Sequence, residues 1–328
     1  MGRRVSRALV VGRPGMLTTV QDRGRWGYQG LGVPVAGPMD WYSHDLANRL
    51  VGNDPDAAAL EVTLIGPELI ADGSGVLCAV TGAAFDVSVE GRPVPLNCPF
   101  EVASGSQVRI GARRAGARAT LAARGGFDLP KTFGSRAMHL VSRMGPFDGR
   151  ALRPGDRLPL IGTGTVTVNP ENGHLGTINC DCHRSGLPLD LPDGGARVRI
   201  VPAAHRERFT TDAWDTLTSA RFTITPQSNR MGYRLSGPPL THRRGADILS
   251  EAMPIGALQV PASGQPILLM ADRQTTGGYA TLANVITADL PTAGQLAPGD
   301  WIEFAACTHA EAIAALRARR RALSGDRS

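Results

Sequence analysis

The chain has 328 residues, of which 42% are hydrophobic and 20% charged, and this balance excludes a disordered chain. No apolar run approaches the roughly 20 residues that span a bilayer, and the N-terminus leads into a strand-like run rather than a signal peptide, so we expect a soluble, cytoplasmic protein. The net charge of +6 does not indicate nucleic-acid binding, because the dense basic cluster at 317–321 has no aromatic-rich or helix-turn-helix motif beside it.

Turns divide the chain into many short segments, because glycine (40 residues) and proline (24 residues) are both frequent. This composition favours short strands over a helical bundle. The runs with a strand-like pattern are Ala8–Val11, Gly75–Val80, Phe85–Val89, Gln107–Ile110, Ala119–Ala122, Arg197–Val201, Arg221–Ile224, Ile267–Ala271, Asn284–Ala288 and Trp301–Phe304. The segments with a helical pattern are Trp41–Val51, with Asp40 as its N-cap, then His205–Thr218 and Ala310–Leu323.

The cysteines do not indicate a structural metal site. Five are present: Cys78, Cys98, Cys180, Cys182 and Cys307. Their odd number and the missing secretion signal predict reduced thiols. His183 follows Cys182 directly, but no second ligand pair stands at the spacing of a zinc site, so we expect no metal in this chain.

The two halves of the sequence resemble each other at fixed offsets. Three residues of the first half recur 205 positions later: Gly27, Tyr28 and Gly32 correspond to Gly232, Tyr233 and Gly237. Two more recur 190 positions later: Glu61 and Gly66 correspond to Glu251 and Gly256. A helical insertion at 40–54, found only in the first half, explains the change of offset. One mostly β unit has therefore been duplicated.

This duplication predicts the domain organisation. We expect a first domain at 1–165, a polar linker at 166–196, a second domain at 197–306 and a C-terminal helix or tail at 307–328. Units of this size, rich in strands and without alternating helices, indicate closed or nearly closed barrels.

Polar residues in glycine-rich segments are the candidates for a ligand site, since the G-x-x-x-x-G-K-[ST] phosphate loop and other common enzyme signatures are absent. In the first segment Asp22, Arg23, Arg25 and Tyr28 place an acceptor, two planar cations and a phenol within seven residues. Arginine suits the recognition of carboxylate, carbonate or phosphate. The alternative is a structured turn in which Asp22 pairs with an arginine and Tyr28 lies in the core.

Two further segments lie in the second half. Gln227, Asn229 and Arg230 belong to the repeated motif and suit a small polar group. The run 272–279 follows an apolar strand and reads either as a loop that cradles a ligand or as a well-capped hairpin. Glu251 stands among apolar residues, where a carboxylate must be paired or titrate abnormally, so we favour a site role for it.

These motifs resemble those of a known family. The quoted runs are Thr19–Tyr28, Gly32–Pro34, Gly37–Asp40, Asn48–Asn53, Ser228–Leu235, Ser250–Glu251, Gly256–Pro261 and Gln274–Tyr279. On these residues the chain is identified as a member of the family that comprises the C subunit of 5-oxoprolinase, allophanate hydrolase subunit 2 and the KipI antagonist, which has a biotin-dependent carboxyltransferase-like domain. The resemblance covers nearly the whole chain, from about residue 9 to residue 304.

The resemblance implies a mainly β fold of two tandem cyclophilin-like β-barrel domains with a few short helices and a substrate cleft between the barrels. It also implies two partners, the KipI-like and LamB/YcsF-like subunits of 5-oxoprolinase, and leaves a homo-oligomer open. With ATP, bound by this chain or by its partner, such a complex hydrolyses 5-oxoproline to glutamate.

The resemblance and the chemistry together assign hypothetical roles, because a poor amide electrophile needs donors aimed at developing negative charge and an acceptor for N–H. The predicted catalytic residues are Asp22, Arg25, Arg230 and Glu251. The predicted substrate-binding residues are Arg23, Tyr28, Gln227, Asn229, Tyr233, Gln259, Asp272, Thr275, Thr276, Gly277 and Tyr279.

Two alternatives stay open. The same module in urea carboxylase moves a carboxyl group from carboxybiotin to urea, but this chain has no biotinyl-lysine context, because Lys131 is its one lysine. A family member also acts as an antagonist by binding its KipI-like partner. A polar pocket that binds a small ligand favours the enzyme, whereas an exposed apolar face favours the antagonist.

Overall fold

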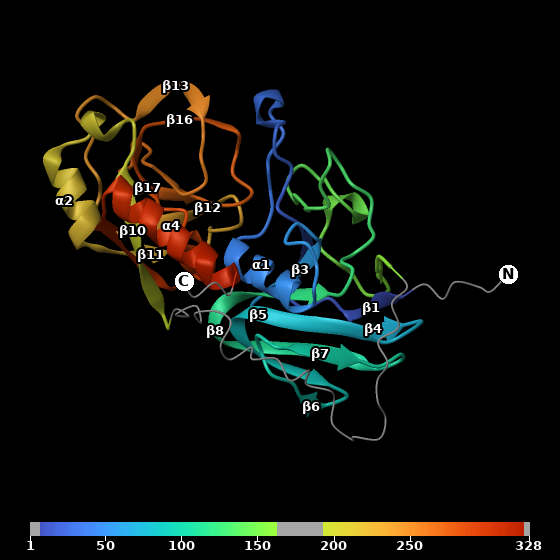
Figure 1. The fold of residues 1–328 in the computed structure, drawn as a ribbon. Coiled ribbons are helices and arrows are strands. Elements are labelled where there is room, and N and C mark those ends of the chain that lie inside the picture. Colours follow the sequence, from blue (N-terminus) through green and yellow to red (C-terminus); the bar gives the residue numbers. More distant parts are fainter. Residues whose placement is uncertain (1–6, 163–192, 325–328) are drawn as a thin grey trace. The chain divides into compact units, whose positions relative to one another are not determined.

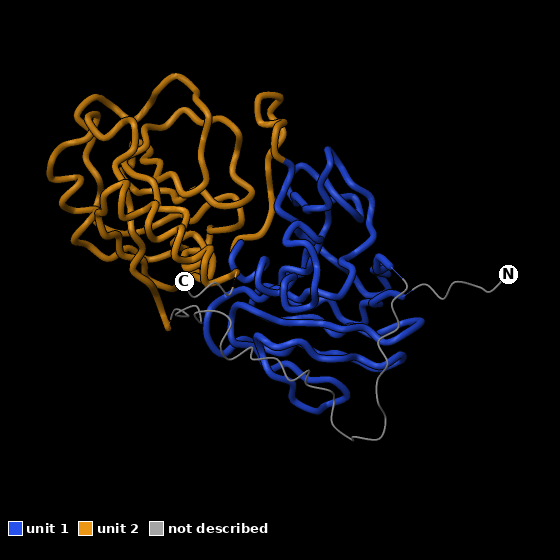
Figure 2. Tube along the Cα trace, viewed as in Figure 1, with its two compact units in different colours: residues 1–25, 41–191 blue, residues 26–40, 192–328 orange. Residues whose placement is uncertain are grey.

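The computed structural model describes residues 7–162 and 193–324 (Figure 1). The described residues are mostly strands with a few short helices, which confirms the expected mainly β fold class. By internal contacts the chain divides into two compact units, one of residues 1–25 and 41–191 and the other of residues 26–40 and 192–328 (Figure 2). We call residues 26–40 the arm, because this segment belongs to the second unit while its neighbours on both sides belong to the first. Cys180, Cys182, His183 and most of the predicted linker at 166–196 lie outside the described residues.

The first unit is built on one nine-stranded sheet. Its main path runs β2-β3-β8-β4-β1-β9, and β5 pairs with β8 while also pairing with the short β6 and β7. The strands are β1 (Ala8–Arg13), β2 (Leu17–Gln21), β3 (Ala59–Thr63), β4 (Glu68–Asp72), β5 (Val76–Val89), β6 (Arg92–Pro93), β7 (Pro99–Val102), β8 (Gln107–Ala123) and β9 (Arg157–Pro159).

The two longest strands each join two runs that the sequence analysis separates. β5 contains Gly82 and β8 contains Gly116, both at positive φ (94° and 73°), and the register between these strands shifts after Gly82. A glycine inside a strand marks a bulge as readily as a turn, and here it bends the strand without ending it. The pairing therefore continues along both strands, and the predicted breaks are wrong.

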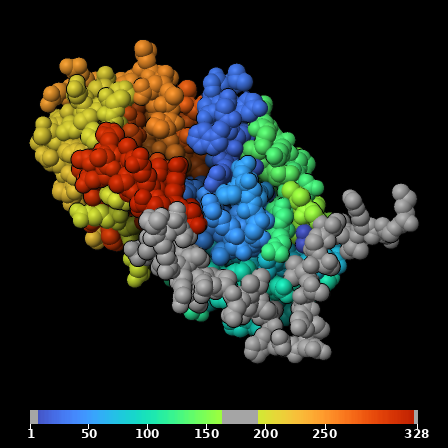
Figure 3. Space-filling view, viewed as in Figure 1, coloured from blue at the N-terminus to red at the C-terminus, as the bar shows by residue number. Residues whose placement is uncertain are grey.

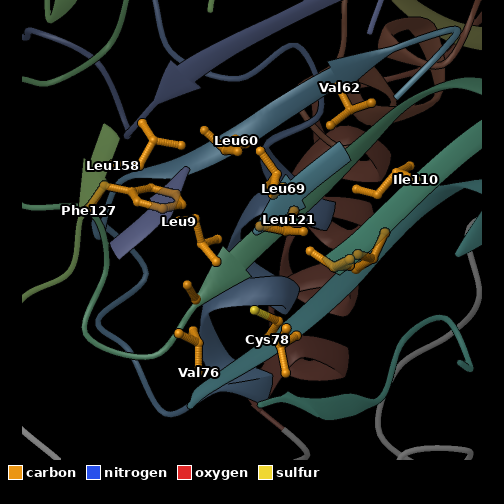
Figure 4. Close-up of a cluster of buried hydrophobic side chains, with 14 of the residues drawn as sticks. Leu9, Leu60, Val62, Leu69, Val76, Cys78, Ile110, Leu121, Phe127 and Leu158 are labelled. Carbon is orange, nitrogen blue, oxygen red and sulfur yellow. The ribbon is translucent and has the colours of Figure 1, made fainter. Parts of the chain in front are cut away.

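The core of the first unit covers both faces of β5. Val76, Cys78 and Val80 point to the large cluster drawn in Figure 4, together with Leu9, Leu69 and other aliphatic side chains. The alternate residues Leu77 and Ala79 pack against Ala47 of helix α1 (Trp41–Leu50), the predicted insertion, and against Val51, which directly follows it. Successive side chains of a strand point to opposite faces, so a strand covered on both sides is apolar throughout.

The second unit is a closed barrel. Its strand order is β10-β17-β14-β15-β12-β11-β18, and parallel pairing of β10 with β18 closes the ring. The barrel strands are β10 (Gly195–Pro202), β11 (Arg221–Ile224), β12 (Gly232–Ser236), β14 (Ala257–Gln259), β15 (Ile267–Leu269), β17 (Thr281–Val285) and β18 (Trp301–Ala306). A separate two-stranded antiparallel sheet consists of β13 (Asp247–Ala252) and β16 (Thr276–Tyr279), and β14 and β15 lie between these two strands in the chain.

The second unit also contains three α-helices among its described residues. The helix expected at His205–Thr218 begins later, as α2 (Thr211–Ser219), because Thr210 accepts a hydrogen bond from the Ala213 amide and caps it. The short α3 (Leu290–Gly294) was not predicted. The last helix, α4 (His309–Ser324), has no buried residue and is visible on the surface in red (Figure 3). None of the described helices is long and apolar enough to cross a membrane.

The cysteines differ in part from expectation. Cys78 and Cys307 are free, as predicted, but Cys98 is disulfide-bonded, so the prediction of reduced thiols is wrong for this residue. Composition sets an expectation for the compartment and does not report which individual thiols approach one another.

Candidate functional site

In the first unit, Asp22 anchors a loop. It is 3% exposed, and its Oδ1 accepts hydrogen bonds from the Gly24 amide (2.9 Å) and the Ser135 hydroxyl (2.5 Å), while Oδ2 accepts one from the Arg136 amide (2.5 Å). A carboxylate that holds several donors in a buried site is oriented by them. Asp22 thus ties the end of β2 to the loop at 132–137.

Arg25 serves the same loop. Its side chain is 1% exposed, and it donates from Nε to the Thr132 carbonyl (3.3 Å) and from Nη2 to the Ala137 carbonyl. Arg23 is more exposed and binds Asp45 of α1 at 2.6 Å, a hydrogen bond that raises the pKa of Arg23. The structure therefore brings the predicted Asp22 and Arg25 onto one loop and directs Arg23 elsewhere.

In the second unit, Arg230 and Asp272 form a buried ion pair. Arg230 is 4% exposed and Asp272 is 2% exposed, and two hydrogen bonds join them, Nε to Oδ2 (2.9 Å) and Nη2 to Oδ1 (3.0 Å). Nη2 of Arg230 also donates to the Gly37 carbonyl at 2.6 Å. The pair is bidentate, the strong arrangement for arginine and carboxylate, and it holds the arm against the barrel.

A second set of contacts fixes the end of the arm. Gln295 donates to the Asp40 carboxylate at 2.6 Å. A Cβ at Gly294 would lie 2.3 Å from the Met39 carbonyl oxygen, so only glycine permits this approach. The predicted Tyr233 is 1% exposed and donates to the Leu296 carbonyl (3.1 Å), directly after these residues. Tyr28, in contrast, lies half-buried within the arm itself, just before the 3-10 turn at Gln29–Leu31.

The remaining polar candidates meet in a pocket of about 260 Å³, which we call the amide pocket. Four carboxamides line it, from Gln227, Asn229, Gln259 and Gln274. Its other lining residues are Met231, Gly232, Arg234, Ile267, Leu269 and Tyr279.

The strand pattern explains where the amide pocket lies. In the paired strands β12, β14 and β15, Tyr233, Leu258 and Leu268 are fully buried, and the alternate residues line the pocket. Alternation places these two sets on opposite faces of the sheet. The pocket therefore opens on the face of the sheet opposite Tyr233 and Leu268. Tyr279 of strand β16 also lines it.

The pocket amides are held by neighbouring groups. Gln274 donates to Oε1 of Gln259 at 3.2 Å, and Nε2 of Gln259 lies 3.1 Å from the sulfur of Met253. A Cβ at Gly277 would lie 2.5 Å from the same Nε2, so the predicted Gly277 lets the backbone of β16 approach Gln259. A groove of about 840 Å³ adjoins the pocket and shares Gln227, Arg234, Ile267 and Tyr279 with it.

Glu251 lies on β13, and Thr275 and Thr276 lie at the start of its partner strand β16. Glu251 is paired in register with Gly277, its side chain is 43% exposed, and Oε1 lies 3.6 Å from Nδ1 of His205. The expected apolar surroundings are therefore absent, because the Glu251 side chain is partly open to solvent. Thr275 accepts the Met253 amide through its carbonyl (3.0 Å), and Thr276 is exposed in β16.

The structure thus sorts the predicted site residues into separate groups. Gln227, Asn229, Gln259 and Tyr279 share the amide pocket, whereas Arg230 with Asp272 and Asp22 with Arg25 each hold a segment of backbone. Gln274 was not predicted, although it lies in a segment that the sequence analysis selected. The described residues contain no group of three or more His, Cys, Asp or Glu side chains that could hold a metal ion.

Comparison with known proteins identifies the family. Residues 31–306 match the model described as "Carboxyltransferase domain, subdomain A and B". The chain belongs to this family.

Other carboxyltransferase-domain proteins match nearly the whole chain. It is 34% identical to the C subunit of 5-oxoprolinase from Escherichia coli over 94% of both proteins. It is 33% identical to the urea amidolyase of Saccharomyces cerevisiae over 90% of this chain, which is 16% of that protein. The crystal structure of the K. lactis urea amidolyase superposes on 98% of this chain with a TM-score of 0.88 and 30% identity, and the chain covers 20% of that structure's length.

Proposed function

We propose that the chain is the C subunit of an ATP-dependent 5-oxoprolinase complex, which converts 5-oxoproline, ATP and water to glutamate, ADP and phosphate. The match to the C subunit of the E. coli 5-oxoprolinase extends over 94% of this chain and 94% of that protein, whereas the match to the S. cerevisiae urea amidolyase covers 16% of that protein. The amide pocket supports a substrate site in this chain, because four carboxamides line a space that suits a small ligand.

The chemistry of the pocket suits a cyclic amide. A carboxamide side chain offers both N–H donors and a carbonyl acceptor, so a pair of them satisfies the N–H and the C=O of a lactam together. Gln259 and Gln274 already form such a pair with each other, and their remaining donor and acceptor sites are the ones we assign to substrate. Leu269 and Ile267 supply the apolar wall for the ring.

The residues of the two anchoring groups have a different role in this proposal. Asp22 and Arg25 position the loop at 132–137, and Arg230 with Asp272 positions the arm. Hydrolysis of an unreactive amide depends on groups held in a fixed place, so positioning residues contribute to turnover without contacting substrate. The catalytic assignments of Asp22, Arg25, Arg230 and Glu251 stay predictions.

The sequence offers ATP no G-x-x-x-x-G-K-[ST] loop. The amide pocket, of about 260 Å³, is small for a nucleotide, and the adjoining groove of about 840 Å³ shares Gln227 and Arg234 with it. We therefore propose that ATP is bound with or by a partner, and that the partners are the KipI-like and LamB/YcsF-like subunits in the cytoplasm.

A second candidate function is carboxyl transfer to urea or a related amide. It is favoured by the likeness to urea amidolyases in sequence and structure, although the chain spans only 16% and 20% of those proteins. Urea offers the same N–H and C=O groups as a lactam, so the amide pocket suits it too. A role as a KipI-binding antagonist needs no such pocket.

Co-expression with both partners separates these functions. The complex is purified, and ADP and glutamate are measured with 5-oxoproline, with urea or with no substrate. We expect both products with 5-oxoproline and only when all three subunits are present. A stable complex that releases no ADP with either substrate would move the assignment to the antagonist role, and ADP release with urea plus a biotin carboxylase partner would favour carboxyl transfer.

A further inference from the structure

Within the described residues, Arg273 is a buried cation without an acidic partner. Its side chain is 8% exposed, and its hydrogen bonding there consists of one bond, from Nε to the Met253 carbonyl at 2.9 Å. The neighbouring Asp272 is engaged by Arg230. Burial lowers the pKa of Arg273 to about 10, so the guanidinium is still charged at neutral pH.

Arg273 uses fewer of its donors than Arg25 and Arg230, two other buried arginines. Arg25 donates to two carbonyls and Arg230 to a carboxylate and a carbonyl. An arginine that served only to hold the fold would be expected to use its donors in the same way, because a buried charge without partners is destabilising. Toward the described residues, Arg273 uses one of the five N–H donors that a guanidinium carries.

The other donors of Arg273 are accessible. Some side-chain nitrogens of the described residues are sealed from solvent and lack a hydrogen-bond acceptor, but neither Nη1 nor Nη2 of Arg273 is among them. Because the Met253 carbonyl fixes Nε, the guanidinium is held with its Nη1–Nη2 edge available. This edge matches the two oxygens of a carboxylate or a phosphate.

The position of Arg273 connects it to the amide pocket. Met253 accepts from Arg273 through its carbonyl, and its sulfur contacts Gln259, one of the residues that line the pocket. Gln274, which also lines the pocket, is the next residue in the chain. Arg273 and the pocket amides therefore share one supporting residue.

We propose that Arg273 is a binding site for the oxyanion of a reactant, through bidentate hydrogen bonds from Nη1 and Nη2. If the proposed function holds, on which this identification of the ligand rests, the oxyanion is the carboxylate of 5-oxoproline. A desolvated, fixed guanidinium binds such a group more strongly than an exposed one, because water no longer screens the charge.

The test titrates the full chain with acetate, inorganic phosphate, 5-oxoproline and the neutral lactam 2-pyrrolidinone at constant ionic strength, followed by calorimetry. The variants are Arg273→Met, Arg273→Lys and, as a matched control, Arg197→Met, which removes an exposed guanidinium from β10. We expect saturable binding of at least one of the three anions by the wild type and by the control, weakened at least tenfold in Arg273→Met and by less in Arg273→Lys. Binding of 2-pyrrolidinone should be the same in all four proteins.

Thermal unfolding separates this role from a structural one. Removal of the Arg273 charge leaves no acidic group behind that lacks a partner, so Arg273→Met should melt at the same temperature as the wild type or a few degrees higher. A lower melting temperature together with unchanged anion binding would show that Arg273 is structural and would overturn the proposal.

The outcomes also separate this inference from the proposed function. Failure of the wild type to bind any of the three anions, or binding that survives in Arg273→Met, overturns the inference even where the complex turns over 5-oxoproline. Arg273-dependent binding of acetate or phosphate by a chain whose complex ignores 5-oxoproline supports the inference and removes the proposed function.

Discussion

The same repeated motif has different structures in the two units. Residues 232–236 form strand β12 of the closed barrel, whereas the equivalent residues 27–31, at the offset of 205, belong to the arm and form no strand. The first unit therefore has no strand at the position equivalent to β12, because residues 27–31 belong to the second unit. Its sheet is an open path, and the barrel of the second unit is closed. A duplicated unit can therefore keep its motif while the residues that carry it form part of the other compact unit.

Two arginines at equivalent positions of the repeat each bind a backbone carbonyl. Arg25 and Arg230 occupy the same place in the repeat, both are buried, and each donates to the carbonyl of a segment distant in sequence. Arg230 also pairs with Asp272, and its target is the arm. The comparison indicates that the repeated arginine retains an anchoring function, while the anchored segment differs.

The largest effect is expected for Arg230→Met, which removes the guanidinium that pairs with the buried Asp272. We expect a loss of about 3–5 kcal/mol in the free energy of unfolding, measured by urea denaturation. The double variant Arg230→Met with Asp272→Leu should recover much of this loss. Arg25→Met should cost less than Arg230→Met, because Thr132 and Ala137 accept through uncharged carbonyls. Equal losses for the two arginines would break the comparison.

Asp22→Ala should have the next largest effect. It removes the acceptor of three hydrogen bonds from Gly24, Ser135 and Arg136, so we expect a loss of roughly 2–3 kcal/mol in urea unfolding. Asp22→Asn retains the Oδ1 acceptor and should lose less. Limited proteolysis should show cleavage in the loop at 132–137 in the alanine variant, and a digestion pattern identical to the wild type would remove the anchoring role.

Gly294→Ala tests how the arm is held from the other side. The added Cβ would lie 2.3 Å from the Met39 carbonyl, so the arm or α3 must shift, at a cost of about 1–3 kcal/mol. Faster proteolysis of the arm is the expected readout. The matched control is Gly30→Ala, which adds a Cβ in open space and should leave the arm protected from proteolysis. Gly299→Ala is unsuitable as a control, because alanine is strained at its φ of +94°.

The smallest effect concerns pH and the first unit. His44 on α1 is buried, and desolvation lowers its pKa from the ordinary value of 6.5. As the pH falls below 6.5, His44 therefore becomes protonated in the unfolded chain while it stays neutral in the folded chain. The free energy of unfolding decreases as a result, by at most about 1.4 kcal/mol per pH unit. His44→Gln should flatten this slope between pH 7 and 5.5 in urea unfolding, and an unchanged slope would show that other groups cause it.

Sequence analysis predicted much of this arrangement because the relevant signals are local. The strand content, the duplication, helix α1 and the candidates Gln227 and Asn229 followed from residue patterns, whereas Gln259 was named through the family resemblance. The bulges at Gly82 and Gly116 were taken for turns, since a positive φ is compatible with either. The arm was not foreseen, because its place in the second unit depends on tertiary contacts of Gly37 and Asp40 that leave no periodic pattern.

The site was predicted less completely for a related reason. A charged residue in a motif looks the same in sequence whether it binds a ligand or a backbone carbonyl, so Asp22 and Arg230 could not be told from ligand-binding groups. Arg273 and Gln274 lay in a selected segment without being singled out, because they stand in irregular chain before β16, where no periodic pattern predicts which side chain is buried and which lines a pocket.

The central claim is that the amide pocket binds the substrate, and the Michaelis constant for 5-oxoproline in the assembled complex tests it most directly. The variants are Gln259→Met, which removes one pocket amide while conserving size, and Gln107→Met as a matched control in the first unit. The account predicts a Michaelis constant raised about five- to thirtyfold in Gln259→Met, from the loss of hydrogen bonds worth about 1–2 kcal/mol, with no change in the control. An unchanged Michaelis constant in Gln259→Met would contradict it.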